Sequence, residues 1–247
     1  MMGAILFFFF LYHLYWVSFR LMVHGQAHRV WKLSPILEHI CRFLQWLTFG
    51  NSWNGSWLQL LVAQHRIHHR DADTPNDLLS PHVFTLKELF KGIKDVVPGR
   101  PFYISPEDIA TYGSDFKIYD DWLENNVYRH RWLGMNILWI IYTLLFGIPG
   151  FLVGGFHRFY ITYFNIWVSL YLYHKIGYRK KGYDGSDQSR NIFPIGILFA
   201  GEELHGNHHT TPYLKNYAIR WYEFDIGYWY AKFFKFIGLL EFKDKNN

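Results

Sequence analysis

Long apolar runs alternate with polar segments along the chain and predict helices that cross a membrane or lie on it. Residues 3–23 form an almost unbroken apolar run that is long enough to cross a bilayer. This run lacks a basic start and a small-residue cleavage site, so we expect an anchoring helix rather than a signal peptide. Residues 132–153 and 159–177 are two further apolar runs. The pattern therefore predicts about three transmembrane helices.

The second and third runs are joined by a segment rich in glycine and proline, residues 147–155. This segment predicts the turn of a transmembrane hairpin, with Arg158 at its tip. Of the 25 Lys and Arg residues, all except Arg20 and Arg158 are then expected on one side of the membrane. The positive-inside rule makes that side cytoplasmic.

Two other segments mix apolar and polar residues and predict amphipathic helices in the membrane interface. Residues 40–63 carry Arg42 and Gln45 among apolar side chains, and residues 221–240 are rich in aromatic side chains. No Gly/Ser linker or internal repeat divides the chain. We therefore predict a single domain over residues 1–247, an all-α integral membrane protein with a cytoplasmic helical cap.

The composition excludes several classes of protein. Hydrophobic residues make up 50% of the chain and aromatic residues 21%, which excludes a disordered chain. Cys41 is the only cysteine, so neither an intrachain disulfide nor a thiolate metal cluster can form. The formal charge of +5 is modest, and no basic run indicates a nucleic-acid partner.

Histidine is the unusual component, with 14 residues in the chain. Two segments repeat the pattern H-x-x-H-H, of which this histidine content gives about 0.04 copies by chance. Residues three and four apart share one face of a helix, so each repeat could direct three imidazoles to one point. Nine histidines are candidate metal ligands: His24, His28, His65, His68, His69, His174, His205, His208 and His209. The other five need no special role: His13, His39, His82, His130 and His157.

The candidate ligands follow the expected membrane segments, and they can meet only on one side of the bilayer. Residues 40–63 therefore must not cross about 30 Å of hydrocarbon. Nine imidazoles exceed the needs of one metal ion and predict two metals with four or five ligands each, for which iron, copper, nickel and zinc all remain open. Carboxylates that could hold the second ring nitrogen of these histidines are Asp71, Asp73, Asp77, Glu202 and Glu203.

This series of histidine motifs around membrane hairpins resembles the membrane fatty acid desaturases, in particular their acyl-CoA and acyl-lipid delta-9 branch. The resemblance covers residues 23–240. It also includes shorter motifs: Asp73-Thr74 and Asp77 after the second histidine group, Gly177-Tyr178-Arg179 after His174, Ser189-Arg190-Asn191, Gly201-Glu202, and Arg220-Trp221 followed by Asp225.

The resemblance implies an oxygen-dependent enzyme with two ferrous ions held by the nine histidines. It would insert a cis double bond into the acyl chain of an acyl-CoA or a membrane lipid. Electrons are expected from a separate donor of the cytochrome b5 or ferredoxin type with its reductase. The expected location is the endoplasmic reticulum or the bacterial inner membrane, with the histidines on the cytoplasmic side.

Three departures from the family pattern keep alternatives open. The first motif is H-x3-H, a spacing also found in hydroxylases, so a fatty acyl or alkane-type hydroxylase on the same scaffold remains an alternative. Leu170 stands where the family often has an asparagine. Only one apolar run precedes the first motif where the family has two, so we expect either a shortened start or a three-span form. A zinc-dependent hydrolase and a non-catalytic lipid-binding relative are further alternatives.

Three arginines close to the motifs, Arg66, Arg70 and Arg190, could bind the phosphate or carboxyl head group of a substrate. Each could equally be an ordinary charge on the cytoplasmic face.

Overall fold

A computed structural model describes the chain except for residues 51–56, 95–100, 180–184 and 244–247. The described residues are mainly helical, which confirms the predicted helical class, with two small two-stranded sheets added. The helices are α1 (Met2–Phe19), α2 (Gly25–Ala27), α3 (Pro35–Phe49), α4 (Trp57–Asp71), α5 (Leu86–Lys94), α6 (Pro106–Tyr112), α7 (Arg131–Phe146), α8 (Ile148–Tyr163), α9 (Asn165–Lys175), α10 (His205–Thr210) and α11 (Ile226–Phe236). Shorter π or 3-10 segments are η1 (Arg20–His24), η2 (Glu124–Tyr128) and η3 (Glu202–Leu204).

The first helix continues without a break from α1 through η1 into α2. It covers Met2–Ala27, 26 residues, and therefore measures about 39 Å. Among the described residues it is the one helix long and apolar enough to cross a membrane. Leu6, Phe9 and Phe10 near its start are exposed, whereas Leu21, Met22 and Val23 are buried. Its far end is therefore enclosed by the rest of the chain.

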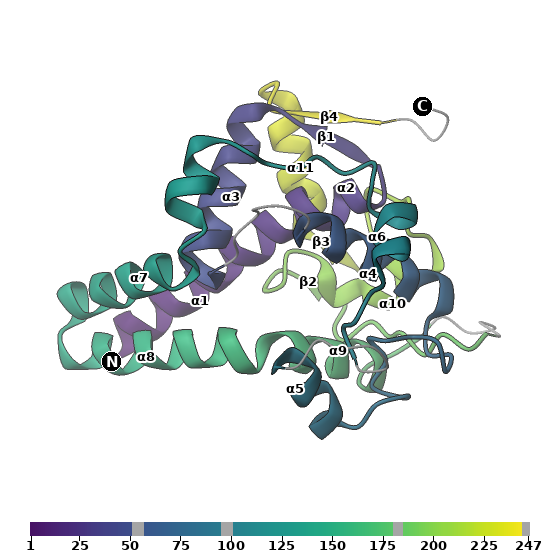
Figure 1. Cartoon of the computed structure of the whole chain (residues 1–247), viewed down its shortest axis with the longest axis horizontal. Coiled ribbons are helices and arrows are strands. Elements are labelled where there is room, and N and C mark those ends of the chain that lie inside the picture. The colour runs from purple at the N-terminus through teal and green to yellow at the C-terminus, as the bar shows by residue number, and fades with distance from the viewer. Residues whose placement is uncertain (51–56, 95–100, 180–184, 244–247) are drawn as a thin grey trace.

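Helices α7 and α8 form an antiparallel hairpin whose turn is shorter than the sequence predicted. α7 ends at Phe146, Gly147 adopts a positive φ of 61°, and α8 begins at Ile148. The predicted turn over 147–155 is thus wrong, because residues 148–155 are helical. Gly150 is needed for close packing, since an added Cβ would lie 1.8 Å from the Tyr142 carbonyl oxygen. Figure 1 shows α1, α7 and α8 extending side by side to one end of the molecule, where the N-terminus lies.

The shorter turn also moves Arg158 and divides the predicted third span. Arg158 was expected at the hairpin tip, but its guanidinium lies 5.1 Å from the centre of the Trp132 ring, at the start of α7. It is therefore at the opposite end of the hairpin from Gly147. Residues 159–177 do not form one helix, because α8 ends at Tyr163 and α9 begins at Asn165. α7 has 16 residues, about 24 Å, which is less than the ~30 Å hydrocarbon core.

The predicted interfacial segment 40–63 belongs to two helices, and residues 51–56 between them lie outside the described part. Ser34 caps α3, its Oγ accepting a hydrogen bond from the Leu37 amide, and Pro35 occupies the first turn. Gly50 ends α3 in the left-handed conformation at φ 70°. Ile36, Ile40 and Phe43 are exposed on α3, which gives this helix an apolar face that none of the described residues covers.

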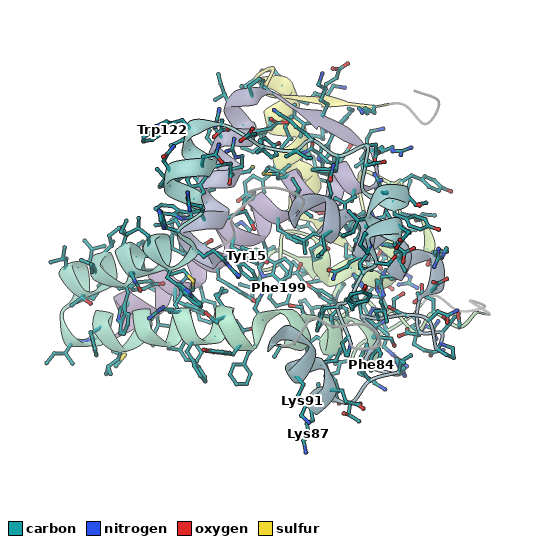
Figure 2. All side chains as sticks on the ribbon, in the orientation of Figure 1. Tyr15, Phe84, Lys87, Lys91, Trp122 and Phe199 are labelled. Atoms are coloured by element: carbon teal, nitrogen blue, oxygen red, sulfur yellow. The ribbon has the colours of Figure 1, made fainter. Side chains whose placement is uncertain are left out.

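The C-terminal part of the chain returns to the first helix. Strand β1 (Trp31–Leu33) pairs antiparallel with β4 (Leu240–Phe242), and β2 (Ile195–Gly196) pairs parallel with β3 (Phe224–Asp225). Asp225 caps α11 by accepting from the Tyr228 amide at 3.0 Å. In Figure 2, Tyr15 and Phe199 lie in the interior, whereas Trp122, Lys87 and Lys91 project outward. The apolar core therefore surrounds the end of the first helix, where His24 and His28 lie.

Candidate metal centre

All nine candidate histidines lie in two adjoining sets. The five-histidine group consists of His24, His28, His65, His69 and His208, and the four-histidine group of His68, His174, His205 and His209. Within each group the ligand atoms lie within 4.8 Å of one another. The four-histidine group is fully buried, whereas three members of the five-histidine group are partly exposed.

Each H-x-x-H-H motif is divided between the two groups, which differs from the expectation that all three imidazoles meet at one point. His65 and His69 on α4 join the five-histidine group, and His68 joins the other. On α10 the division is reversed, with His208 in the five-histidine group and His205 and His209 in the other. Adjacent residues of a helix point about 100° apart, so the paired histidines serve neighbouring sites.

The imidazoles of the five-histidine group turn their Nε2 atoms toward one another. The Nε2 atoms of His24 and His208 are 2.7 Å apart, those of His28 and His65 2.6 Å, and those of His69 and His208 2.8 Å. The two groups touch where the rings of His69 and His209 lie 4.0 Å apart between centroids. Two sets of nitrogen donors thus converge at neighbouring points.

Carboxylates hold the second ring nitrogen of four of these histidines. Nδ1 of His68 lies 2.8 Å from an oxygen of Asp77. Nδ1 of His174 lies 2.9 Å from Asp73, and Nδ1 of His209 lies 2.9 Å from Asp187. In the five-histidine group, Nδ1 of His24 lies 2.5 Å from Glu202. A carboxylate at Nδ1 fixes the tautomer in which Nε2 carries a lone pair, as in metal-binding histidines.

The described residues leave several of these nitrogens without a partner although they are buried. Nε2 of His68, His174, His205 and His209 makes no hydrogen bond within the described part of the chain. Buried polar atoms are nearly always paired, so four unpaired nitrogens at one point indicate a ligand that supplies the missing bonds. The donor set fits a metal ion that accepts neutral imidazole.

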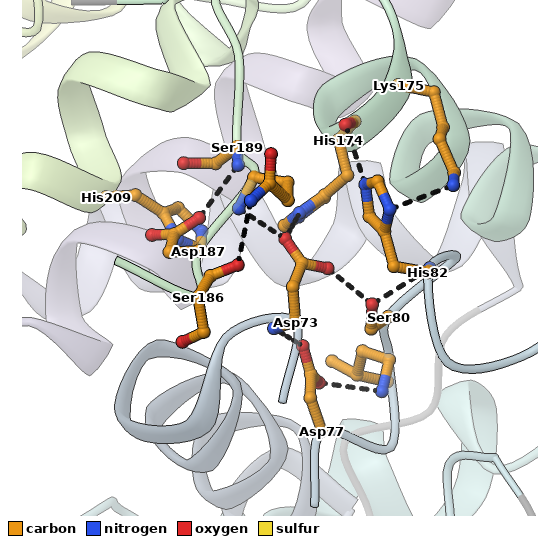
Figure 3. A network of polar contacts seen from close by, with 12 residues as sticks. Asp73, Asp77, Ser80, His82, His174, Lys175, Ser186, Asp187, Ser189 and His209 are labelled. Atoms are coloured by element: carbon orange, nitrogen blue, oxygen red, sulfur yellow. Dashed lines mark hydrogen bonds and ion pairs between the residues drawn. The ribbon is translucent and has the colours of Figure 1, made fainter. Parts of the chain in front are cut away.

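The carboxylates of the four-histidine group form one network, shown in Figure 3. Asp73 accepts from His174 and from the Gln188 amide at 2.6 Å, and also from the Ser80 hydroxyl. Asp187 accepts from the Ser189 amide at 2.8 Å. Burial alone would raise the pKa of both carboxylates. Hydrogen bonds from His174 and Ser80 nevertheless lower the pKa of Asp73, and the hydrogen bond from His209 lowers the pKa of Asp187. Both carboxylates are therefore ionised at neutral pH.

One histidine, His68, differs from its neighbours in both groups in its electrostatic surroundings. Burial and neighbouring imidazoles lower the pKa of His65, His69 and His208 well below its ordinary value, so these rings are neutral. Burial also lowers the pKa of His68 and is the largest single influence, but the hydrogen bond to Asp77 and the charges of Asp77, Asp73 and Asp187 together outweigh it and raise the pKa. Neutral imidazole is the form that binds a metal.

Glu202 lies beside Arg20, a buried arginine. In the sequence, Arg20 appears only as a charge within the first apolar run. The Arg20 guanidinium lies 3.6 Å from Glu202, 3.6 Å from Asp225 and 3.3 Å from the centre of the Tyr217 ring. Burial raises the pKa of Glu202 to about 7, and the charge of Arg20 opposes this rise. Arg20 thus supports the carboxylate that orients His24.

The predicted supporting carboxylates divide into those that contact histidines and those that do not. Asp73, Asp77 and Glu202 do, whereas Asp71 pairs with Arg70 and Glu203 accepts from the Phe199 and Gly201 amides. Asp187 was missed, because it lies in an irregular segment with no helical spacing to the histidine motifs. No local sequence signal identifies it.

The three arginines predicted for head-group binding are held by protein atoms. Arg66 donates to the Ala27 carbonyl at 2.8 Å and to Asp115, Arg70 pairs with Asp71, and Arg190 donates to the Gly177 carbonyl at 3.3 Å. None of the three lines the cavity beside the histidines. Their role in head-group binding stays a prediction.

A largely apolar cavity of about 170 Å³ opens beside both histidine groups. Leu170, which replaces the asparagine of the family pattern, is part of its wall. The wall is formed by Tyr15, Trp16, Phe19, Val23, His24, Phe49, Leu61, Gln64, His65, His68, Leu79, Phe102, Asn165, Ser169, Leu170, Tyr173, Glu202 and His205. A mainly hydrocarbon wall next to nitrogen donors fits an apolar ligand held beside a metal.

Comparison with known proteins gives relatives of one kind. The chain is 29% identical over 184 residues to an sn-1 stearoyl-lipid 9-desaturase of Anabaena variabilis (72% of this chain, 62% of the relative). It is 30% identical over 180 residues to an sn-1 stearoyl-lipid 9-desaturase of Synechocystis sp. (72% and 53%). An acyl-CoA C20 Delta5-desaturase of Anemone leveillei is 28% identical over 223 residues (86% and 64%). No protein-family model matches the chain.

The fold and the site define a helical protein with two adjoining histidine groups that could hold metal ions beside an apolar cavity. The relatives narrow this class, because those described above are desaturases of lipid-bound and acyl-CoA chains, and a further relative is a hex-5-enoyl-[acyl-carrier protein] acetylenase of Moorena producens. Relatives at 26–30% identity over most of the chain are desaturases or desaturase-like proteins, which confirms the resemblance to the fatty acid desaturase family seen in the sequence. The chain spans between about half and two thirds of the length of the relatives described above.

Proposed function

We propose that the chain is a fatty acyl desaturase that uses two iron ions, one in each histidine group, and dioxygen to insert a cis double bond into an acyl chain. The observation that carries this proposal is the convergence of nine imidazoles into two adjoining groups beside an apolar cavity. The names of the relatives support an acyl substrate, carried as acyl-CoA or in a membrane lipid.

The chemistry needs a metal because an unactivated C–H bond has no acidic proton for a side chain to remove. Bound iron would supply the oxidising power, with the nine histidines as its ligands. Removing two hydrogens from neighbouring methylenes and reducing one dioxygen to two waters consumes two more electrons and two protons. These electrons come from a separate donor of the cytochrome b5 or ferredoxin type with its reductase.

The residues of the chain have three tasks in this reaction. The carboxylates at Nδ1 keep the imidazoles in the ligating tautomer. The apolar side chains of the cavity, such as Phe19 and Leu61, exclude water and hold one methylene pair beside the histidines. Arg66, Arg70 and Arg190 are proposed to attract an anionic head group at the protein surface.

The whole chain acts as one membrane-bound domain in this proposal. The helix Met2–Ala27 crosses the bilayer, and the hairpin of α7 and α8 with α9 provides the other spans. α3 and α11 lie in the interface, and the histidines face the cytoplasm, in the endoplasmic reticulum or the bacterial inner membrane. The aromatic residues Trp221, Trp229 and Phe233 are exposed and would contact the interface.

Expression in a desaturase-deficient host tests the proposal. Fatty acids extracted from cells that express the chain should contain a new unsaturated product, identified with its double-bond position by mass spectrometry. Purified protein should contain iron. Membranes without new unsaturated fatty acid, despite folded and iron-loaded protein, would refute the desaturase proposal.

A hydroxylase is the second candidate because the first motif has the spacing H-x3-H. The same product analysis distinguishes the two reactions, since a hydroxylase gives an alcohol where a desaturase gives a double bond. The relatives favour the desaturase.

A further inference from the structure

Phe102 lines the cavity but, unlike most of the other lining residues, does not lie on a helix. Helices supply most of the wall, whereas Leu79 and Phe102 come from the segments that connect α4 with α6. The Phe102 side chain is buried, with 8% of its surface exposed. An aromatic ring from outside the helices therefore closes part of the cavity.

The backbone of Phe102 is held in a conformation that a bulky residue rarely adopts. Its φ is +67°, in the left-handed region that favours glycine. Such a conformation persists only where the surroundings fix it, and it is often found at functional sites. Phe102 thus carries a large side chain on a backbone conformation that favours glycine.

Two hydrogen bonds fix the backbone of Phe102 against α4 and the segment before it, and a neighbouring residue adds a packing contact. The Phe102 amide donates to the Leu78 carbonyl at 3.3 Å, and the Phe102 carbonyl accepts from Nε2 of Gln64. Two residues later, Ile104 packs in one cluster with Ala63 and Ile67 of α4. The backbone of Phe102 is therefore positioned largely by α4, the helix that carries the second histidine motif.

These contacts place Phe102 beside the histidines. Gln64 precedes His65, and Leu78 follows Asp77, whose carboxylate lies 2.8 Å from Nδ1 of His68. Gln64, His65, His68 and Phe102 all line the same cavity. Phe102 therefore lies in the cavity wall close to the second histidine motif.

We propose that Phe102 is a specificity-determining residue that excludes acyl chains with a methyl branch near the reacting methylenes. This inference rests on the proposed function, because it takes the cavity as the acyl site. One methyl group too many in a tight hydrophobic site changes binding by about tenfold or more. Removing the ring should therefore admit branched chains and leave straight chains able to bind.

The test compares the binding of two probes to the purified full-length chain in lipid nanodiscs. The probes are radiolabelled stearic acid and its analogue with a methyl branch in the middle of the chain. Phe102→Ala removes the ring. Phe116→Ala is the matched control, because Phe116 has the same 8% exposure and belongs to the core but does not line the cavity.

We expect Phe102→Ala to shift the ratio of the two dissociation constants about tenfold toward the branched probe. Phe116→Ala should leave the ratio as in the wild type. An unchanged ratio in Phe102→Ala, with both probes binding to the wild type, overturns the inference and leaves the proposed function standing. If the wild type binds neither probe, the acyl site itself is refuted, and the inference fails with it.

A second variant separates the ring from the backbone conformation. Phe102→Gly also removes the ring, but glycine adopts a positive φ without strain, so this variant should melt at a higher temperature than Phe102→Ala. Both variants should show the same shift in the probe ratio. If Phe102→Ala does not fold, Phe102→Gly decides the outcome: a wild-type ratio in Phe102→Gly contradicts the inference.

Discussion

The five-histidine and four-histidine groups consist of the same kind of side chain in different surroundings. Three carboxylates, Asp73, Asp77 and Asp187, contact the four-histidine group, which is fully buried. Among the described contacts, the five-histidine group has Glu202, whose charge is offset by Arg20, and three of its members are partly exposed. Buried cations need nearby negative charge, so the carboxylates rather than the imidazoles distinguish the two groups.

The largest effect is expected from removing a histidine of the five-histidine group. His208 contacts both His24 and His69 through Nε2, so His208→Ala should abolish product formation and lower the iron content by about half. Fatty-acid profiling and metal analysis measure both effects. His39→Ala, an exposed histidine outside both groups, is the control. Desaturation that persists in His208→Ala would contradict the two-metal proposal.

A smaller effect is expected when the charge around the four-histidine group is reduced. Asp73→Asn and Asp187→Asn keep the shape of the side chain but lose the negative charge at Nδ1 of His174 and His209. Each should weaken binding of the metal in this group by about 10–100-fold. Competition with a chelator measures this change, with the exposed Asp120→Asn as control. An affinity equal to that of the control would show that the carboxylates only position the chain.

Glu202→Gln should have a weaker effect than either aspartate variant. The negative charge of Glu202 is already offset by Arg20, so its loss changes the field at His24 less. We expect a loss of about tenfold in metal affinity, confined to the five-histidine group. The same chelator competition measures it. A loss larger than that of Asp187→Asn would reverse the proposed difference between the groups.

The last prediction concerns pH in the metal-free protein. His65 has a lowered pKa, chiefly through burial, whereas the charge of Asp77 raises the pKa of His68 against burial. Below about pH 6.5 the unfolded chain protonates His65 and the folded protein does not, so the free energy of unfolding falls as the pH drops. His65→Asn should flatten this slope by up to about 1.4 kcal/mol per pH unit.

His68→Asn is the matched variant for the pH prediction, because its raised pKa gives a contribution of the opposite sign. Chemical denaturation of metal-free protein between pH 5 and pH 7, a range of about two units around the ordinary histidine pKa, measures the slope. Equal slopes in both variants would show that His65 and His68 do not differ in this way.

The sequence indicated which nine histidines meet, because histidine spacing is regular and its frequency is far above chance. It did not indicate how the nine histidines divide into two groups, since this depends on how α4 and α10 are rotated against their neighbours in the fold. Their role as ligands stays a prediction. Asp187 and Arg20 could not be found in this way, because their partners lie far along the chain: 22 residues separate Asp187 from His209 and 182 separate Arg20 from Glu202.

The fold, like the site, was predicted from the sequence only in part. The apolar run at the N-terminus predicted a helix that the structure contains, because length and composition decide that element. The turn between α7 and α8 was placed wrongly because glycine has two uses. Gly147 supplies the positive φ of the turn, whereas Gly150 and Gly154 allow α7 and α8 to approach closely. Composition alone does not distinguish a glycine needed for a turn from a glycine needed where two helices pack closely.

The division of His68 from His69, and of His208 from His209, has a mechanical consequence. One peptide bond in α4 and one in α10 each join the two groups covalently. Two such tethers, from helices more than 130 residues apart in the chain, set the spacing of the groups through the bond lengths of the backbone. The spacing between the sites should therefore be resistant to changes in the surrounding side chains, and a one-residue deletion in either helix should exchange ligands between them.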